Sequence, residues 1–225
     1  MQSAFPNRSV AGHRLAQELS WLKQVESRSR NERIVIIAIP RGGVVIGDRI
    51  ATELEAELDI VVSRKIGAPD NPEFAIGAVM PDGTYFLNQE QVHMLNIPLE
   101  YIQTKANTEL KEIDRRLKFY RGSKEYGNKF EDKTLLLVDD GIATGSTILA
   151  SAKWLKNKQN CKKLIIATPV APPDILDNLK QVADDVIVLD TPDPFIAIGR
   201  FYEDFAQVTD EEVIGIMRKY GYSVS

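Results

Sequence analysis

Apolar residues gather in five short, nearly continuous runs, separated by stretches in which they recur with helical spacing. The runs, rich in Ile, Leu and Val, cover residues 34–39, 58–63, 133–139, 163–170 and 185–190. Such runs are typical of strands that are buried on both faces of a parallel sheet. Apolar residues three or four apart follow the first, third and fourth runs, which indicates amphipathic helices. The pattern therefore predicts an α/β fold with a mainly parallel sheet flanked by helices.

Four further segments lie outside this alternation. Residues 7–26 predict a leading amphipathic helix, and residues 99–120 predict a longer helix with a charged outer face. The runs 74–80 and 84–88, joined by a Pro-Asp-Gly turn, predict a hairpin. Thr209 and Glu212 match a capping box, and Gly221 has the position of a helix-terminating glycine, so a last helix is expected between them.

We expect these elements to form a single domain over residues 1–225. Its core would comprise residues of about 30–66 and 130–192. A lid, the hairpin and the long helix would occupy about 67–125, and a C-terminal hood segment about 192–225.

Composition narrows the classes of function. The chain has 28 Lys and Arg against 32 Asp and Glu, a net charge of −4, which argues against nucleic-acid and anionic-membrane partners. Cys161 is the one cysteine, so no intrachain disulfide can form, as in a reducing compartment. No apolar stretch approaches the roughly 18 residues of a spanning helix, and the N-terminal residues lack the apolar core of a signal peptide. A cytoplasmic protein is expected.

The candidate chemistry lies in residues 134–155, where a buried strand leads into Asp139 and Asp140 and then into a small-residue turn and a helix. Gly141 and Gly145 allow backbone amides to converge, and the helix N-terminus adds unpaired N–H groups, so the turn can bind a phosphate. Hydroxyl groups that can add hydrogen bonds belong to Thr144, Ser146 and Thr147.

This turn is neither a Walker A loop nor a dinucleotide-binding loop. A Walker A loop needs a lysine before its Ser or Thr, but position 145 is a glycine and no lysine occurs between Asp139 and Lys153. In a dinucleotide-binding loop the acidic residue follows the glycines, whereas here the two aspartates precede them. Carboxylates beside a phosphate site suit a ribose 5-phosphate, whose 2′- and 3′-hydroxyls they would bind. The alternative is a surface turn in which the aspartates act as caps.

The segment VDDGIATGST closely resembles the phosphoribosyl pyrophosphate (PRPP) motif of type I phosphoribosyltransferases. The resemblance implies that Asp139 and Asp140 bind the ribose hydroxyls and act in catalysis. It also implies that the 5-phosphate is bound by Ala143, Thr144, Gly145, Ser146 and Thr147. The segments 5–8, 71–78 and 202–205 resemble a little-characterised bacterial branch of the same family.

Two basic elements extend the resemblance. The sequence Pro-Arg-Gly-Gly follows the first strand, and the resemblance assigns Arg41, Gly42 and Gly43 to the pyrophosphate leaving group. Arg64 and Lys65 are expected at the carboxyl end of the second strand, where open α/β sheets bind ligands, and would neighbour the pyrophosphate. The alternative for this basic pair is a solvated strand end.

Residues 67–77 match the position of the family's mobile catalytic loop, and residues 66–80 are the candidate lid that would exclude water. Hypoxanthine–guanine enzymes place a proton-handling aspartate where this chain has Ala143, so Glu73 on the lid is the candidate for proton transfer, weighed evenly against a plain loop glutamate.

The segment 192–205 loosely resembles the part of purine enzymes that contacts base and metal. Asp193 would approach Mg²⁺, which PRPP and water mainly hold. Phe195 or Phe201 would flank a base, or would simply pack, and Arg200 would add positive charge.

The resemblance thus implies Mg²⁺-dependent transfer of the 5-phosphoribosyl group of PRPP to a nitrogenous acceptor, such as a nucleobase. Pyrophosphate would leave through an oxocarbenium-like transition state. We also expect a homo-oligomer. Two other interpretations stay open: a non-catalytic module that senses PRPP or a nucleotide, and a protein in which the 99–120 helix is an interaction or oligomerisation face.

Overall fold

The structure is a computed structural model that describes residues 4–23 and 34–224. Its centre is a five-stranded sheet with the strand order β2-β1-β6-β7-β8, and all four pairings are parallel. The strands are β1 (Ile34–Ala38), β2 (Glu57–Ile60), β6 (Thr134–Val138), β7 (Lys163–Val170) and β8 (Asp185–Asp190). The α/β architecture predicted from the apolar runs is therefore confirmed.

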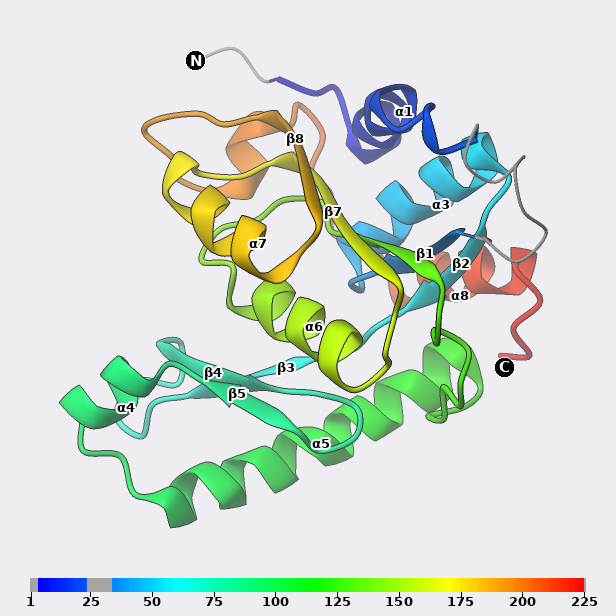
Figure 1. Ribbon diagram of the computed structural model, residues 1–225. Helices are drawn as coiled ribbons and strands as arrows, with labels where there is room; N and C mark the ends of the chain where they lie inside the picture. Colours follow the sequence, from blue (N-terminus) through cyan, green and yellow to red (C-terminus); the bar gives the residue numbers. More distant parts are fainter. Residues whose placement is uncertain (1–3, 24–33, 225) are drawn as a thin grey trace.

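Helices cover both faces of this sheet (Figure 1). On one face lie α1 (Arg8–Glu18) and α3 (Gly42–Leu54), and on the other lie α6 (Ser146–Asn157) and α7 (Leu176–Val182). Short 3₁₀ helices span Pro173–Ile175 (η1) and Ile198–Phe201 (η2), and α8 (Asp210–Lys219) packs against α3. Along the chain, α3 connects β1 to β2, α6 connects β6 to β7, and α7 connects β7 to β8, as crossover helices do in other parallel sheets.

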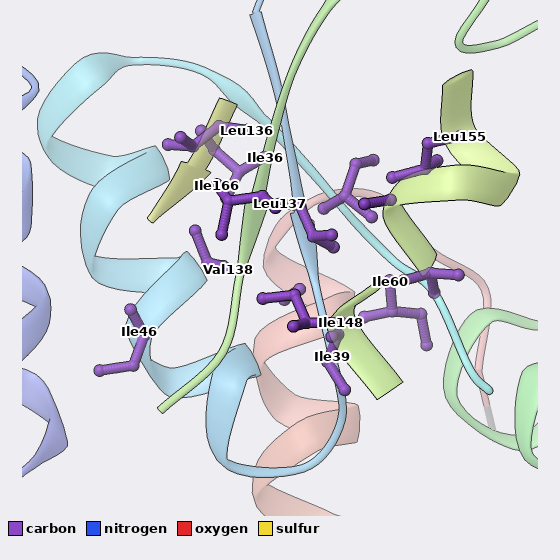
Figure 2. Close-up of a cluster of buried hydrophobic side chains, with 14 of the residues drawn as sticks. Ile36, Ile39, Ile46, Ile60, Leu136, Leu137, Val138, Ile148, Leu155 and Ile166 are labelled. Carbon is purple, nitrogen blue, oxygen red and sulfur yellow. The ribbon is translucent and has the colours of Figure 1, made fainter. Parts of the chain in front are cut away.

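The core lies between the sheet and these helices. Figure 2 shows Ile36 and Leu136 from neighbouring strands, with Ile46 from α3 and Ile148 and Leu155 from α6. All five side chains are at most 2% exposed. Burying one such side chain stabilises a fold by about 1.5–3 kcal/mol, so the apolar runs are the main source of stability for the strands that position the site.

One strand departs from the prediction. The run 185–190 was expected to be buried on both faces, but every residue of β8 is half-buried. The reason is position: β8 forms one edge of the sheet and pairs with β7 alone.

A second, antiparallel sheet has the order β3-β4-β5 and consists of β3 (Arg64–Gly67), β4 (Ala75–Val79) and β5 (Tyr85–Leu87). The predicted hairpin of β4 and β5 is confirmed, with Gly83 in its turn at a φ of +80°. The apolar run 58–63 is only partly a strand, because β2 ends at Ile60 and the chain leaves the central sheet. A new strand begins at Arg64.

The helices α4 (Gln89–Met94) and α5 (Leu99–Arg121) complete this accessory region. Along α5, Ile113 and Leu117 are fully buried and Tyr120 is 2% exposed. This stripe packs against β3, β4 and α8. The apolar face of the 99–120 helix therefore packs largely within the chain. A role of this helix in interaction or oligomerisation stays a prediction.

Near the termini the predicted elements are present but shorter. α1 ends at Glu18, although Leu19 and Leu22 are buried as expected, and residues 24–26 of the predicted helix lie outside the described residues. Thr209 and Glu212 form the predicted capping box, with reciprocal hydrogen bonds of 2.7 and 3.1 Å at the start of α8.

Cys161 is buried, and burial raises the pKa of its thiol to about 11. Within residues 4–23 and 34–224, no helix combines the length and apolar character needed to cross a membrane.

A buried ion pair joins α5 to the central sheet. Asp59 of β2 is fully buried and accepts hydrogen bonds from Nε of Arg121 at 2.7 Å and from its Nη2 at 3.1 Å. Lys129 adds a second cation, with its Nζ 3.0 Å from Oδ2 of Asp59. Arg121 also donates to the carbonyl oxygen of Glu125 at 2.6 Å. The C-terminal end of the long helix is thereby fixed to β2.

Arg121→Ala should lower the free energy of unfolding by about 3–5 kcal/mol, because it leaves the buried Asp59 carboxylate without its bidentate partner. The matched control is Arg115→Ala, on the exposed face of the same helix, where the guanidinium pairs with Glu112 and the expected loss is below about 1 kcal/mol. Urea denaturation measures both. Equal losses for the two variants would contradict the role of the buried pair.

Candidate functional site

The carboxyl ends of β1 and β6 bring two predicted motifs together. These strands are neighbours in parallel register, with Ala38 opposite Val138. The turn that follows β1, residues 40–43, and the aspartates that follow β6 therefore lie at the same edge of the sheet. In open α/β sheets this edge is where ligands bind.

The two motifs approach so closely that glycine is required. A Cβ on Gly42 would lie 1.8 Å from Oδ2 of Asp140. A Cβ on Gly43 would lie 2.9 Å from the carbonyl oxygen of Val138 and 3.0 Å from Cα of Asp139. Space, rather than backbone conformation, therefore demands both glycines.

The turn after Asp140 forms a pocket of about 190 Å³, lined by Asp139, residues 141–148 and Ile198. Gly145 precedes α6 with a φ of +73° and makes no side-chain cap. The first N–H groups of α6 consequently have no capping side chain and can bind an anion. A Cβ on Gly141 would lie 2.5 Å from Cγ2 of Ile198, so the segment after β8 closes one side of this pocket.

The acid pair has an unequal environment. Burial, and then the charge of Asp140, raises the pKa of the Asp139 carboxyl well above its usual range. Oδ1 of Asp139 accepts a hydrogen bond of 2.9 Å from the backbone N–H of Asp140. Oδ2 of Asp140 accepts one of 2.7 Å from Nε of Arg8, and both of these side chains are largely buried. One arginine thus offsets the charge of the second carboxylate.

Arg8 and Tyr202 were not among the predicted site residues. The hydroxyl of Tyr202 donates to the carbonyl oxygen of Asp140 at 2.6 Å. Phe5 forms a β-bridge with Tyr202, which brings the segments 5–8 and 202–205 together beside the acid pair. The sequence signal was the family resemblance of these two segments, but nothing in their local pattern showed that they meet Asp140.

The predicted pyrophosphate residues are distributed over two regions. Arg41 lies at the site, directly before α3. Its Nη1 is 3.5 Å from Oδ1 of Asp210. The same oxygen of Asp210 accepts a hydrogen bond from the Tyr120 hydroxyl. Arg64 and Lys65 do not end the second strand as predicted: they belong to β3 of the accessory sheet. There Arg64 pairs with Glu109 at 2.9 Å and Lys65 with Glu73 at 2.6 Å.

The predicted lid, residues 66–80, comprises the end of β3, the turn 68–74 and β4. Glu73 lies on this turn with an 88% exposed side chain. A hydrogen bond from Lys65 lowers the pKa of Glu73.

The segment after β8 has mixed exposure. Asp193 and Arg200 are exposed and Phe195 is half-buried. Phe201 is 5% exposed and its ring packs 5.2 Å from that of Phe195. Packing therefore explains Phe201, and Phe195 is the more accessible of the two rings.

A parallel sheet flanked by helices, with an acid pair and a small-residue turn at its carboxyl edge and a small antiparallel sheet beside it, defines the phosphoribosyltransferase fold. Residues 11–199 match the family described as phosphoribosyl transferase domain, and the chain belongs to this family.

Two relatives from Mycobacterium tuberculosis, strains CDC 1551 and H37Rv, each named "Putative phosphoribosyl transferase", are 33% identical to it over 213 residues. This match covers 95% of the chain and 46% of each relative, so the chain spans about half the length of those proteins. The crystal structure of TT1426 from Thermus thermophilus is similar over 96% of this chain and 98% of its own, with 34% identity and a TM-score of 0.79.

Gly42→Ala should destabilise the protein by about 1–3 kcal/mol, because the new methyl group overlaps the Asp140 carboxylate and forces the turn and the acid pair apart. Gly215→Ala is the matched control: nothing lies within 4 Å of its added Cβ inside α8, so a gain of roughly 0.5–1 kcal/mol is expected. Thermal or urea unfolding checks both signs. A neutral Gly42→Ala would contradict the close packing of the two motifs.

Asp139→Asn should stabilise the ligand-free protein at pH 7. The folded-state pKa of Asp139 is raised, so ionisation costs more in the folded than in the unfolded chain, and stability falls as pH rises through that pKa. The amide removes this cost, about 1.4 kcal/mol for each pH unit by which the pKa is raised. Its oxygen can still accept the hydrogen bond from Asp140 N–H.

Urea denaturation between pH 4 and 8 measures the difference between the two proteins. Asp70→Asn, an exposed carboxylate on the 68–74 turn, should change stability by less than about 0.5 kcal/mol. A less stable Asp139→Asn at pH 7 would show that ionised Asp139 supports the fold.

Proposed function

We propose that this chain transfers the 5-phosphoribosyl group of PRPP to a nitrogenous acceptor and releases pyrophosphate. The observation that carries the proposal is the place of Asp139 and Asp140, between the amide-lined pocket after β6 and the Gly42–Gly43 turn after β1. PRPP carries a phosphate on one side of its ribose and a pyrophosphate on the other. Its binding site therefore needs phosphate-binding groups on both sides of the groups that bind the ribose hydroxyls. Hydroxyls require acceptors, and phosphates require amides and cations.

In the proposed reaction the bond between C1 of the ribose and the pyrophosphate oxygen breaks, and a bond from C1 to the acceptor nitrogen forms. Residues 143–147 would hold the 5-phosphate and the acid pair would hold the 2′- and 3′-hydroxyls. Arg41 and the amides of the following turn would stabilise the charge that develops on the pyrophosphate. Positive charge on the ribose ring in the transition state would be favoured by the nearby carboxylates.

Mg²⁺ is the metal that the family implies. Among the described residues, no group of three or more His, Cys, Asp or Glu side chains converges as a metal site. This sparse donor set suits Mg²⁺, which keeps several waters and is held largely by substrate phosphates. Asp193 would be the protein's own carboxylate toward it, and the bound ion would neutralise charge on the leaving pyrophosphate.

The acceptor side of the site would be formed by the accessory region. The turn 68–74 would close over the substrate and exclude water, with Arg64 and Lys65 of β3 near the pyrophosphate after closure. Glu73 on the turn would take the acceptor's proton, and Phe195 would flank a planar acceptor. The acceptor class is a nucleobase or a related nitrogen compound.

A second candidate function is PRPP or nucleotide sensing without transfer. The observation that favours it is the Arg8–Asp140 ion pair, which already occupies one oxygen of a carboxylate that the reaction would use. The residue at 143, an alanine, likewise supplies no proton-transfer group in the turn.

The double variant Asp139→Asn, Asp140→Asn should lose PRPP affinity by at least about 100-fold, because each charged hydrogen bond to a ribose hydroxyl is worth about 1.5–3 kcal/mol. Titration calorimetry with PRPP and Mg²⁺ measures the affinity, and circular dichroism checks that the fold survives. Asp174→Asn, an exposed carboxylate outside the pocket, is the control. Undiminished affinity in the double variant would refute the assignment of the acid pair.

Pyrophosphate release separates the two candidate functions. The wild-type protein with PRPP, Mg²⁺ and a panel of purines, pyrimidines and other nitrogen nucleophiles should release pyrophosphate with at least one acceptor. Tight PRPP binding without release from any acceptor would instead support the sensing function.

A further inference from the structure

Asp140 is held by a residue 132 positions earlier in the chain. Nε of Arg8, at the start of α1, lies 2.7 Å from Oδ2 of Asp140. The side chains are 11% and 13% exposed, so this is a largely buried ion pair rather than a solvated surface contact. Charge-assisted hydrogen bonds in such an environment are strong and directional.

Arg8 is itself held from other directions. Its Nη1 donates to the carbonyl oxygen of Ala206 at 2.7 Å. Its guanidinium carbon lies 3.8 Å from the centre of the Phe205 ring, within the range of a cation–π contact. The absent side chain of Gly42 gives it room, since a Cβ there would lie 2.9 Å from its Nε. The guanidinium therefore has one well-defined orientation.

The ion pair has two consequences for Asp140. Oδ2 accepts a hydrogen bond from Arg8, which fixes the orientation of the carboxylate and so the directions in which it can accept hydrogen bonds from a ligand. The guanidinium also offsets one of two neighbouring negative charges at a place where a phosphorylated sugar must approach. A carboxylate without this partner could rotate and would repel the same ligand.

We propose that Arg8 is a positioning residue for the sugar: through its ion pair it orients the Asp140 carboxylate toward the ribose hydroxyls of the bound substrate. This inference rests on the proposed function, because it concerns the same ribose site. Arg8 belongs to α1 and lies outside the turns after β1 and β6. In this proposal it determines how well the site distinguishes ribose from sugars that lack a hydroxyl.

A purely structural role for Arg8 leads to a different expectation. The same side chain joins α1 to the segment 202–206, so its loss could merely loosen that contact. Loosening would lower the melting temperature and would weaken the binding of all sugar phosphates to the same extent. Loss of Asp140 orientation would instead reduce the preference for one sugar phosphate over another.

The test compares ribose 5-phosphate with 2-deoxyribose 5-phosphate, and PRPP with Mg²⁺, by titration calorimetry well below the melting temperature. Wild type should prefer ribose 5-phosphate by about tenfold. Arg8→Met should reduce that preference to about twofold or less and should lower the affinity for PRPP by at least about tenfold. Arg8→Lys, which keeps the charge, should restore part of the preference. If Arg8→Met does not fold, Arg8→Gln takes its place.

Arg14→Met is the matched control. Arg14 lies on the same helix, donates to the carbonyl oxygen of Ala4 at 3.1 Å and stacks 4.9 Å from the Phe5 ring, but makes no contact with Asp140. Its loss should leave the sugar preference unchanged. A wild-type protein that binds neither PRPP nor ribose 5-phosphate would overturn the proposed function and this inference with it. Wild-type binding with an unchanged preference in Arg8→Met would overturn the role of Arg8 alone.

Discussion

The close approach of two turns at the carboxyl edge of the sheet is the constraint on which the site depends. The Gly42–Gly43 turn after β1 packs directly against the Asp139–Asp140 segment after β6, with no room for a Cβ at either glycine. Parallel pairing of β1 with β6 sets this distance, and the helices α3 and α6 start from the two turns. Any change that separates the turns would also separate the groups proposed to bind ribose and pyrophosphate.

Charge at the site is balanced locally. The chain carries a net charge of −4, and its acid pair faces the place proposed for a polyanion. The pKa of Asp139 is raised by burial and by its neighbour, and Asp140 is countered by Arg8. Net charge therefore bears on nucleic-acid binding over a broad surface but not on a phosphate ligand in one turn.

The accessory region is connected to the same edge through polar contacts. Asp210, at the start of α8, contacts both Arg41 of the turn after β1 and Tyr120 of α5. Arg121, the residue after Tyr120, fixes the same end of α5 to the buried Asp59 of β2. The C-terminal end of the long helix is thus attached to α8 and to the central sheet, and the same helix packs against β3 and β4 of the small sheet.

Periodicity and local motifs in the sequence were enough to determine the parallel sheet, the amphipathic helices, the hairpin and the turn at residues 139–147, because burial and turn chemistry act over a few neighbouring residues. The tertiary structure alone decided the contacts between distant segments. It placed Arg8 on Asp140, moved Arg64 and Lys65 into a separate sheet, left β8 at an edge and buried the apolar face of α5. Each of these depends on which elements become neighbours in space, and no local pattern contains that information.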